Sequence, residues 1–334
     1  MKKTTYILLM VLSGALAQAQ LLPTYGGERA GLSALSFLKN DMSPRSQALG
    51  GASTALSGDA YAIYHNPAGM TNLDATAISL SHYFIGGGIN QSWLSGIFPI
   101  DDASSIGASF NMLNSGALEE RTEFQPNGTG RVFYANNASF GVSYARQLSS
   151  QFEIGVTLKY IFEQLADYYN HTAAVDVGFL YQTDWKELQF SVLVRNFGGN
   201  SSLSGTYIAS GFNRLQSGNL EDNTLPNVFS LGVSMVPYEE DRHRILTAIQ
   251  LNHPNDNAEN YRLGIEYEYM RILAVRAGYK INVTGQSWPT FGMGIRYPMG
   301  GHPVYFDYSV NPTNHLGFQQ NIGIRIELNK DLRE

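Results

Sequence analysis

Extended stretches of alternating apolar and polar residues fill the chain from about residue 75 to near its C-terminal end. In residues 152–162, for example, Phe, Ile, Val, Leu, Tyr and Phe occupy every second position. A repeat of two places successive side chains on opposite faces of a β-strand. Most of these segments run to about 9–12 residues, the length that a tilted strand needs to cross a bilayer. Strands of ordinary globular sheets are nearer 5 or 6 residues. About fourteen segments follow the pattern: 75–86, 90–100, 104–114, 137–148, 151–163, 173–184, 188–197, 227–237, 244–253, 260–270, 272–283, 290–298, 303–310 and 318–328.

The connections between these segments alternate in length. Residues 115–136 and 198–226 form long connections, whereas 149–150 and 185–187 are tight turns. Counted along the chain, the long connections have odd numbers and the short ones even numbers. Transmembrane β-barrels show this alternation, because their extracellular loops are long and their periplasmic turns short. The pattern predicts an all-β fold, a transmembrane antiparallel β-barrel of about 14 strands over residues 75–328.

The polar faces of the predicted strands carry many charged side chains. Unpaired charges would be very costly inside a dry core. In a barrel they can face water, one another or a plug, while the apolar faces meet lipid and the backbone groups pair along a closed ladder. The charges predicted to point inward are Glu153, Lys159, Arg195, Arg262, Glu266, Glu268, Arg276, Lys280, Arg296, Asp307, Arg325 and Glu327.

The N-terminus carries the features of an export signal. Lys2 and Lys3 precede an apolar run over 6–16, and Ala17-Gln18-Ala19 provides a small-x-small cleavage site. Residues 1–19 are therefore predicted to be a cleaved signal peptide. Together with the barrel pattern, this predicts a multi-pass protein of the cell outer membrane in contact with its lipid. The chain has no cysteine, so disulfides cannot stabilise it.

Residues 20–74 differ from the rest of the chain. They are rich in small residues and lack the two-residue repeat. A barrel of this size is wide enough to need a filler, so 20–74 is predicted to be an N-terminal periplasmic or plug segment, with 329–334 as a short C-terminal tail. Residues 61–65 are predicted to form one helical turn. It should stop at Asn66, because Pro67 disfavours the helical conformation there.

Several motifs in this segment carry a family resemblance. They are Phe37-Leu38-Lys39, the run from Pro44 to Gly51, Gly58-Asp59-Ala60 and the run from Tyr64 to Gly69. On these residues the chain resembles the PorV/PorQ branch of FadL-like outer-membrane barrels, which is associated with type IX secretion. The resemblance implies a hatch inside the barrel. The glycines, Asn66 and Pro67 are equally compatible with a turn that leads into the first strand. The hatch residues that follow from the resemblance are Arg45, Gly50, Gly51, Asp59, Asn66, Pro67 and Gly69.

No motif predicts a catalytic, cofactor or metal site. The seven histidines show no ligand spacing, and no nucleophile elbow supports a serine hydrolase. The Gly292-Met293-Gly294 sequence lies in a strand with no helix after it, which excludes a dinucleotide loop. A net charge of −6 and the lack of a basic stripe argue against nucleic acid as a partner. We therefore predict a protein that is not an enzyme and has no cofactor.

Three functions are compatible with such a barrel. The resemblance implies a non-enzymatic binding or scaffold component of type IX secretion or surface attachment, with other secretion-system subunits or exported proteins as partners. The alternatives are a FadL-like transporter with a hydrophobic ligand and an esterase or phospholipase barrel. Long loops on a rigid scaffold commonly bind partners, and aromatic and arginine side chains favour protein recognition. The loop residues predicted to do so are Arg121, Phe124, Tyr134, Tyr207, Phe212 and Arg214.

Overall fold

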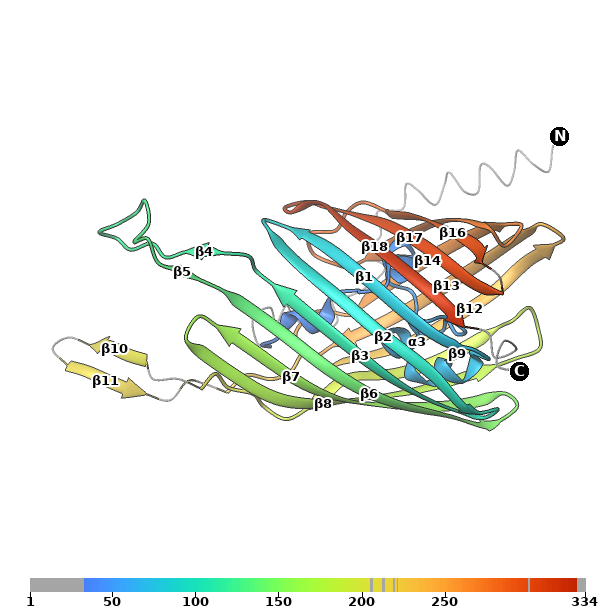
Figure 1. The fold of residues 1–334 in the computed structure, drawn as a ribbon, viewed down its shortest axis with the longest axis horizontal. Coiled ribbons are helices and arrows are strands. Elements are labelled where there is room, and N and C mark those ends of the chain that lie inside the picture. Colours follow the sequence, from blue (N-terminus) through green and yellow to red (C-terminus); the bar gives the residue numbers. More distant parts are fainter. Residues whose placement is uncertain are drawn as a thin grey trace.

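A closed antiparallel barrel of fourteen strands forms most of the molecule (Figure 1). The computed structural model describes residues 33–328, except 205, 206, 212, 213, 219, 221 and 300. The predicted fold class is confirmed. The barrel strands are β1 (Thr76–Gly86), β2 (Ile89–Asp101), β3 (Ser104–Asn114), β6 (Ala135–Ser149), β7 (Phe152–Leu165), β8 (Tyr168–Gln182), β9 (Gln189–Gly198), β12 (Val228–Glu240), β13 (His243–Pro254), β14 (Asn260–Tyr269), β15 (Leu273–Ile281), β16 (Thr290–Met299), β17 (His302–Thr313) and β18 (Gly317–Leu328).

The first and last strands close the barrel. β1 and β18 pair from Thr76 opposite Leu328 to Phe84 opposite Gln320. The alternation in the sequence separates the two faces of the wall: Leu80 is 50% exposed on the outside, whereas Ser79 is fully buried on the inside. Every strand thus has neighbours on both sides, as a lipid-facing sheet requires.

Some strands are longer than their alternation predicted. β8 begins at Tyr168, five residues before the predicted start at 173. The extra residues pair with the end of β7, where the rings of Phe162 and Tyr169 stack with centroids 6.1 Å apart. Cross-strand aromatic pairs of this kind stabilise a ladder.

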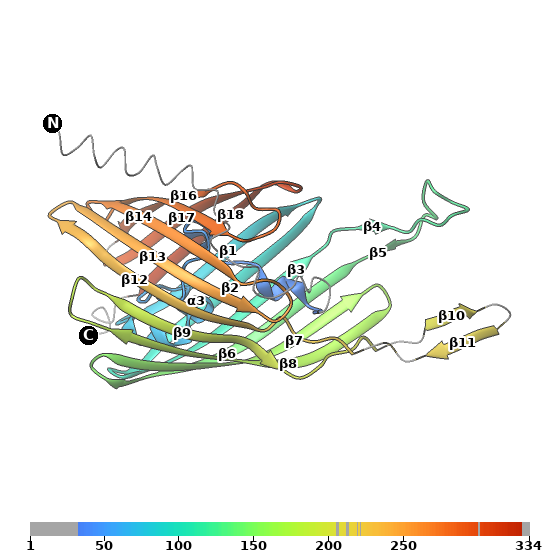
Figure 2. The ribbon, with the colours of Figure 1, turned by 180° about the vertical axis from the view of Figure 1, so that it is seen from behind.

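The two long connections leave the barrel at one end and each contains a hairpin (Figures 1 and 2). Strands β4 (Leu118–Glu119) and β5 (Val132–Phe133) lie in the first, and β10 (Tyr207–Gly211) and β11 (Arg214–Gly218) in the second. These strands were not predicted from the sequence, because two to five residues are too few to show a repeat. Since short turns mark the periplasmic end of such barrels, we expect these hairpins on the extracellular side.

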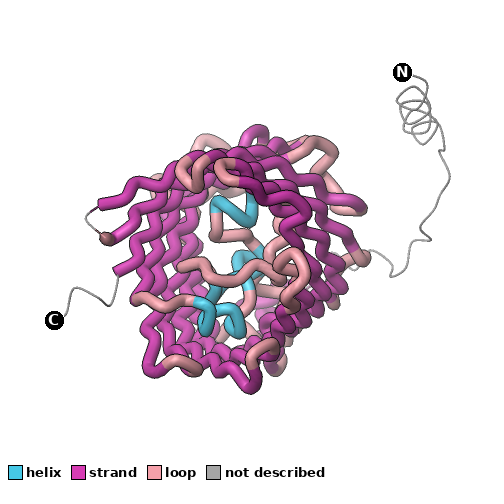
Figure 3. The backbone as a smooth tube through the Cα atoms, turned by 90° about the vertical axis from the view of Figure 1, so that its right-hand side faces the viewer, coloured by secondary structure: helices cyan, strands magenta, loops and turns pink. Residues whose placement is uncertain are grey.

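Residues 33–74, named here the luminal segment, run inside the barrel (Figure 3). They contain the short helices η1 (Ser36–Lys39), α2 (Pro44–Ala48), α3 (Ala62–His65) and η2 (Pro67–Asn72). Ser43 caps α2 by accepting from Ser46 N at 3.3 Å, and the turn of α3 ends before Asn66, as predicted. The predicted signal peptide 1–19, residues 20–32 and the tail 329–334 lie outside the described residues.

The apolar core lies between the luminal segment and the wall. Tyr61 and Ile63 pack against Tyr83, Trp93 and Ile97 of β1 and β2 in one cluster. On the opposite side, Leu49, Ala52 and Leu56 pack against Val236, Leu246 and Ala248 of β12 and β13. Among the described residues, no helix has both the length and the apolar character to cross a bilayer.

Candidate functional site

Six buried charged side chains join the luminal segment to the wall in a closed cycle, named here the ionic ring. Two members come from the luminal segment and one each from β14, β15, β17 and β18. Positive and negative charges alternate around it, and the nitrogen–oxygen distances between neighbours are 2.5–3.0 Å. In order, the members are Arg45, Asp59, Arg325, Asp307, Arg276 and Glu266.

The ionic ring is neutral and each of its carboxylates meets two guanidinium groups. Arg45 donates from Nε and Nη2 to the two oxygens of Glu266, at 2.9 and 2.5 Å. Burial alone would raise the pKa of Asp59, but Arg325 and Arg45 outweigh it and hold that pKa well below the usual range of an aspartate. Removing one partner of a buried pair costs about 3–5 kcal/mol, because the other charge stays buried. The ring therefore fixes the luminal segment to the C-terminal part of the wall.

Glycines on the inner face of the wall let the luminal segment approach closely. A Cβ atom on Gly278 would lie 2.0 Å from Gly50 N, and one on Gly155 would lie 2.3 Å from Ala68 N. Both distances are too short for any side chain. Their role was not predicted from the sequence, although the signal is present: glycine recurs at inward positions of alternating strands. The wall glycines that face the luminal segment are Gly107, Gly155, Gly178, Gly232, Gly264, Gly278, Gly292 and Gly323.

The structure separates the seven predicted hatch residues into different contacts. Arg45 and Asp59 belong to the ionic ring. Gly50 and Gly51 adopt φ values of +68° and +83°, which favour glycine, and Gly50 N donates to the Oγ1 atom of Thr290 at 3.0 Å.

Asn66, Pro67 and Gly69 lie on the other side of the lumen. The Asn66 amide donates to the carbonyl of Phe179 on β8 at 3.0 Å, and its oxygen caps η2. Pro67 packs against Gly155 of the wall, and Gly69 packs against Ser57 within the luminal segment. These residues form a set of packing contacts and do not converge on one point.

His65, a neighbour of the ionic ring, has an unusual environment. Its imidazole is buried, and neither ring nitrogen has a hydrogen-bond partner among the described residues. Burial lowers the pKa of His65 to about 3, despite the opposing effect of Asp59. The ring is thus neutral near pH 7. No group of three or more potential metal ligands occurs in the described part of the chain.

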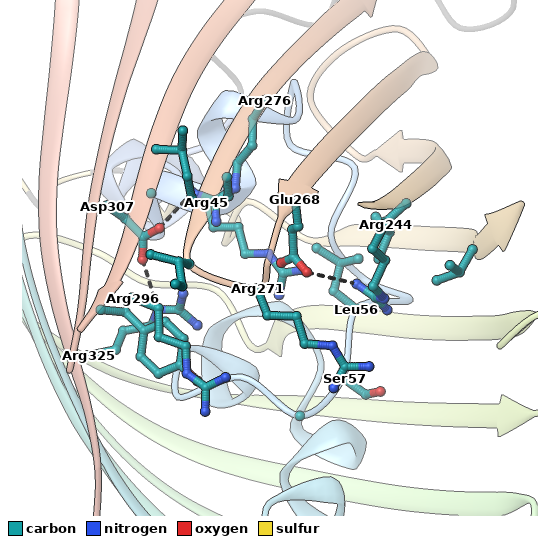
Figure 4. A pocket seen from close by; sticks show the side chains of 18 of the residues that line it. Arg45, Leu56, Ser57, Arg244, Glu268, Arg271, Arg276, Arg296, Asp307 and Arg325 are labelled. Carbon is teal, nitrogen blue, oxygen red and sulfur yellow. Dashed lines mark hydrogen bonds and ion pairs between the residues drawn. The ribbon is translucent and has the colours of Figure 1, made fainter. Parts of the chain in front are cut away.

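Two cavities beside the luminal segment have charged linings. One of about 420 Å³ is lined by ring members and by Arg244, Glu268 and Arg296 (Figure 4). The other, of about 190 Å³, is lined by Asp41 and Arg195 among others. Pockets for hydrophobic ligands are mostly apolar, and neither cavity fits that description.

The long loops contrast with the lumen. In the first, Phe124 is 94% exposed and Tyr134 is 47% exposed, while Arg121 pairs with Glu119 at 3.3 Å. In the second, Tyr207 and Arg214 lie in β10 and β11, and Phe212 lies outside the described residues.

The turn between β7 and β8 connects the bases of the two loops. Asp167 pairs with Arg131 of the first loop at 2.7 Å. Tyr169 and Ser204 of the second loop exchange backbone hydrogen bonds at 2.6 and 3.3 Å. These contacts tie both loops to the same hairpin of the wall, β7–β8.

Known proteins share both the sequence pattern and the fold. Residues 27–252 match the sequence model of the family described as Type IX secretion system protein PorV. No curated protein matches the chain.

Three solved barrels illustrate the shared fold, which is all that identities this low show. The Pseudomonas putida toluene transporter TodX is 13% identical with a TM-score of 0.57, over 86% of this chain and 97% of that one. The Ralstonia pickettii toluene transporter TbuX is 13% identical with a TM-score of 0.53, over 85% and 96%. A Pseudomonas aeruginosa FadL homologue is 12% identical with a TM-score of 0.53, over 90% and 100%. Since the family match covers more than half of the chain, this protein is an outer-membrane β-barrel that belongs to the PorV family.

Proposed function

We propose that this barrel is a non-enzymatic component of type IX protein secretion or surface attachment, which binds other secretion-system subunits or exported proteins. Its membership of the PorV family supports this proposal. The observation that carries it is the filled lumen. The ionic ring and the wall glycines hold the luminal segment against both sides of the barrel. A barrel that binds partners can be filled in this way, whereas a transporter of hydrophobic molecules needs a continuous apolar path.

Side-chain contacts also bridge the irregularity in the hydrogen-bonded ladder between β8 and β9. The ladder shifts register between Val175 and Val177. Asn196 N donates to Asp176 Oδ1 at 2.8 Å, and Lys159 contacts both side chains at 2.5 and 3.0 Å. Polar side-chain contacts thus replace the backbone hydrogen bonds that are missing at this point of the ladder. A lateral exit for an apolar molecule would have to pass through this charged cluster, at a high desolvation cost.

The second candidate function is transport of a hydrophobic small molecule. The fold similarity to two toluene transporters favours it. In this reading the luminal segment must move, because it occupies the space that the ligand would cross. The charged linings of both cavities favour the first candidate.

We assign partner binding to the two long extracellular loops. They exceed what is needed to connect adjacent strands, and Phe124 presents an aromatic ring 94% exposed to solvent. Buried aromatic anchors supply much of the energy of protein interfaces. A side chain of this size contributes most to the binding free energy when a partner covers it.

Replacing the tip of the second loop tests this assignment. Ser201 pairs with Asn223, and Leu225 is buried beside Leu35 and Phe37, so the base of the loop belongs to the barrel. We would therefore replace only residues 206–221 with a short Gly-Ser linker. We expect the heat-modifiable folded band to be unchanged and co-purification of partners from native outer membranes to be lost.

Trp288→Ala provides the matched control. This tryptophan is 65% exposed in the loop between β15 and β16, at the same end of the barrel. The variant should keep its partners. Retention of partners at the wild-type level by the protein without residues 206–221 would show that this loop does not bind them.

A further inference from the structure

The larger cavity lies at the end of the barrel opposite the long loops. Its lining includes Glu187 of the β8–β9 turn. Arg271 of the β14–β15 turn and Leu56 and Ser57 of the luminal segment also line it (Figure 4). Short turns mark the periplasmic end of a barrel. The volume of about 420 Å³ falls in the range of about 300–1,000 Å³ that is typical of ligand sites.

Six arginines line this cavity, and five of them are neutralised by carboxylates. Three belong to the ionic ring. Arg244 pairs with Glu187 at 2.7 Å, and Arg271 pairs with Glu239 at 2.8 Å. The sixth, Arg296 on β16, forms no ion pair with any described residue, and its buried Nε atom lacks a hydrogen-bond partner among them.

The Arg296 guanidinium contacts the aromatic ring of Tyr305, and this contact uses none of the N–H groups of Arg296. The Arg296 guanidinium lies 5.6 Å from the centroid of the Tyr305 ring, and Arg325 lies 4.4 Å from the same centroid. The three residues are register neighbours across β16, β17 and β18. Stacking on an aromatic ring orients a guanidinium and leaves its N–H donors free. Arg296 is therefore a positioned donor that lacks an acceptor.

We propose that Arg296 anchors a periplasmic binding site for a carboxylate group carried on a peptide chain. A guanidinium fork matches the two oxygens of a carboxylate. A monoanion such as a carboxylate meets less repulsion than a dianion such as phosphate from the acidic side chains that share the lining, Glu187, Glu268, Asp307 and Glu327. The cavity has room for several peptide atoms beyond the carboxylate. Ser57, Gln189 and Ser234 also line it. Ser57 and Gln189 hydrogen-bond to each other and Ser234 Oγ donates to Ala55 O, so the hydroxyl oxygens keep lone pairs that can accept from peptide N–H groups.

This site goes beyond the proposed role of the loops and does not depend on it. It would give the barrel a second binding surface on the periplasmic side. Peptide carboxylates reach that side on any exported chain.

Calorimetric titration of the full-length barrel in detergent micelles tests the site. The probe is N-acetyl-trialanine with a free C-terminal carboxylate, compared with its C-terminal amide. We expect binding of the acid at least tenfold tighter than that of the amide, because the amide removes the charge-assisted hydrogen bonds. Arg296→Gln should weaken binding of the acid at least tenfold, and Arg296→Lys, which keeps the charge but not the fork, should have an intermediate effect.

Arg146→Gln is the control variant. It removes an exposed arginine near the same end of the barrel, on β6 and outside the cavity lining, and should bind the acid like the wild type. Equal binding of acid and amide by the wild type, or unchanged binding by a folded Arg296→Gln variant, would overturn the site. Tighter binding of inorganic phosphate would overturn the carboxylate assignment, and acetate binding as tight as that of the peptide would overturn the peptide part. The wild-type comparisons stand even if the Arg296→Gln variant does not fold.

Discussion

The luminal segment and the two long loops are the longest stretches outside the barrel wall in the described part of the chain, and they are built in opposite ways. The luminal segment is fastened by buried ion pairs and by wall glycines that admit its backbone. The loops carry exposed aromatic and charged side chains, and the wall supports them mainly at their bases. A buried segment whose ring charges are all paired has little to gain from a partner. The comparison supports the proposal that the segment completes the barrel and that the loops act outside it.

Opening the ionic ring should have the largest effect on stability. Arg45→Met leaves three buried carboxylates with two arginines, because Asp59, Asp307 and Glu266 remain. We expect the free energy of unfolding to fall by about 3–5 kcal/mol, measured by urea unfolding in micelles with tryptophan fluorescence. Arg271→Met is the control, since its pair with Glu239 is exposed and should contribute about 0–1 kcal/mol. Equal losses in both variants would show that the ring does not fix the segment.

Filling the space of a wall glycine should have a smaller effect. The Cβ atom of Gly278→Ala would meet the backbone of Gly50 at 2.0 Å. Overpacking of this kind typically costs about 1–3 kcal/mol. Gly199→Ala, where nothing lies within 4 Å of the new Cβ atom, should stay within about 0.5 kcal/mol of the wild type. The same unfolding assay compares them, and a neutral Gly278→Ala would argue against close packing of the segment.

The sequence predicts the strands of the wall far better than it predicts the contacts between the wall and the luminal segment. Alternation identified the strands and placed Glu266, Arg276, Asp307 and Arg325 on the inner face. It could not show that they form one ring, because their partners depend on strand register and on the path of a segment more than 200 residues away. Arg45 and Asp59 were singled out only through the family resemblance.

The loops show the same limit in another form. Their length was evident, but the hairpin pairs in them are too short to produce a repeat. The contacts that support them come from Asp167 in the turn between β7 and β8 and from Tyr169 at the start of β8. Such contacts with loop residues leave no period in the sequence.

Acidification should loosen the luminal segment through His65. Burial lowers the pKa of His65 to about 3, against about 6.5 in the unfolded chain. Between these values the unfolded state binds more protons, so stability decreases as the pH falls from about 6.5 towards 3. Comparing the wild type with His65→Gln between pH 7 and 4.5 isolates this contribution, because the low pKa of Asp59 keeps that group charged there. We expect a shallower loss of stability in the variant. Parallel curves would contradict a buried neutral imidazole.

The most direct test of the contrast between the luminal segment and the loops is a disulfide that links the segment covalently to the wall. The chain has no cysteine, and Ser191 Oγ of β9 lies 3.1 Å from Thr54 Oγ1 of the luminal segment, so Thr54→Cys with Ser191→Cys can form a single engineered disulfide. Ser143→Cys with Thr157→Cys, whose hydroxyl oxygens are 2.7 Å apart within the wall, is the matched control. The measurement is secretion of exported proteins to the surface of cells that carry only the variant, with and without reductant. If the segment is a fixed part of the barrel, both oxidised variants secrete like the wild type. Loss of secretion in the oxidised Thr54–Ser191 variant alone, restored by reductant, would show that the segment moves as a hatch and would contradict this account.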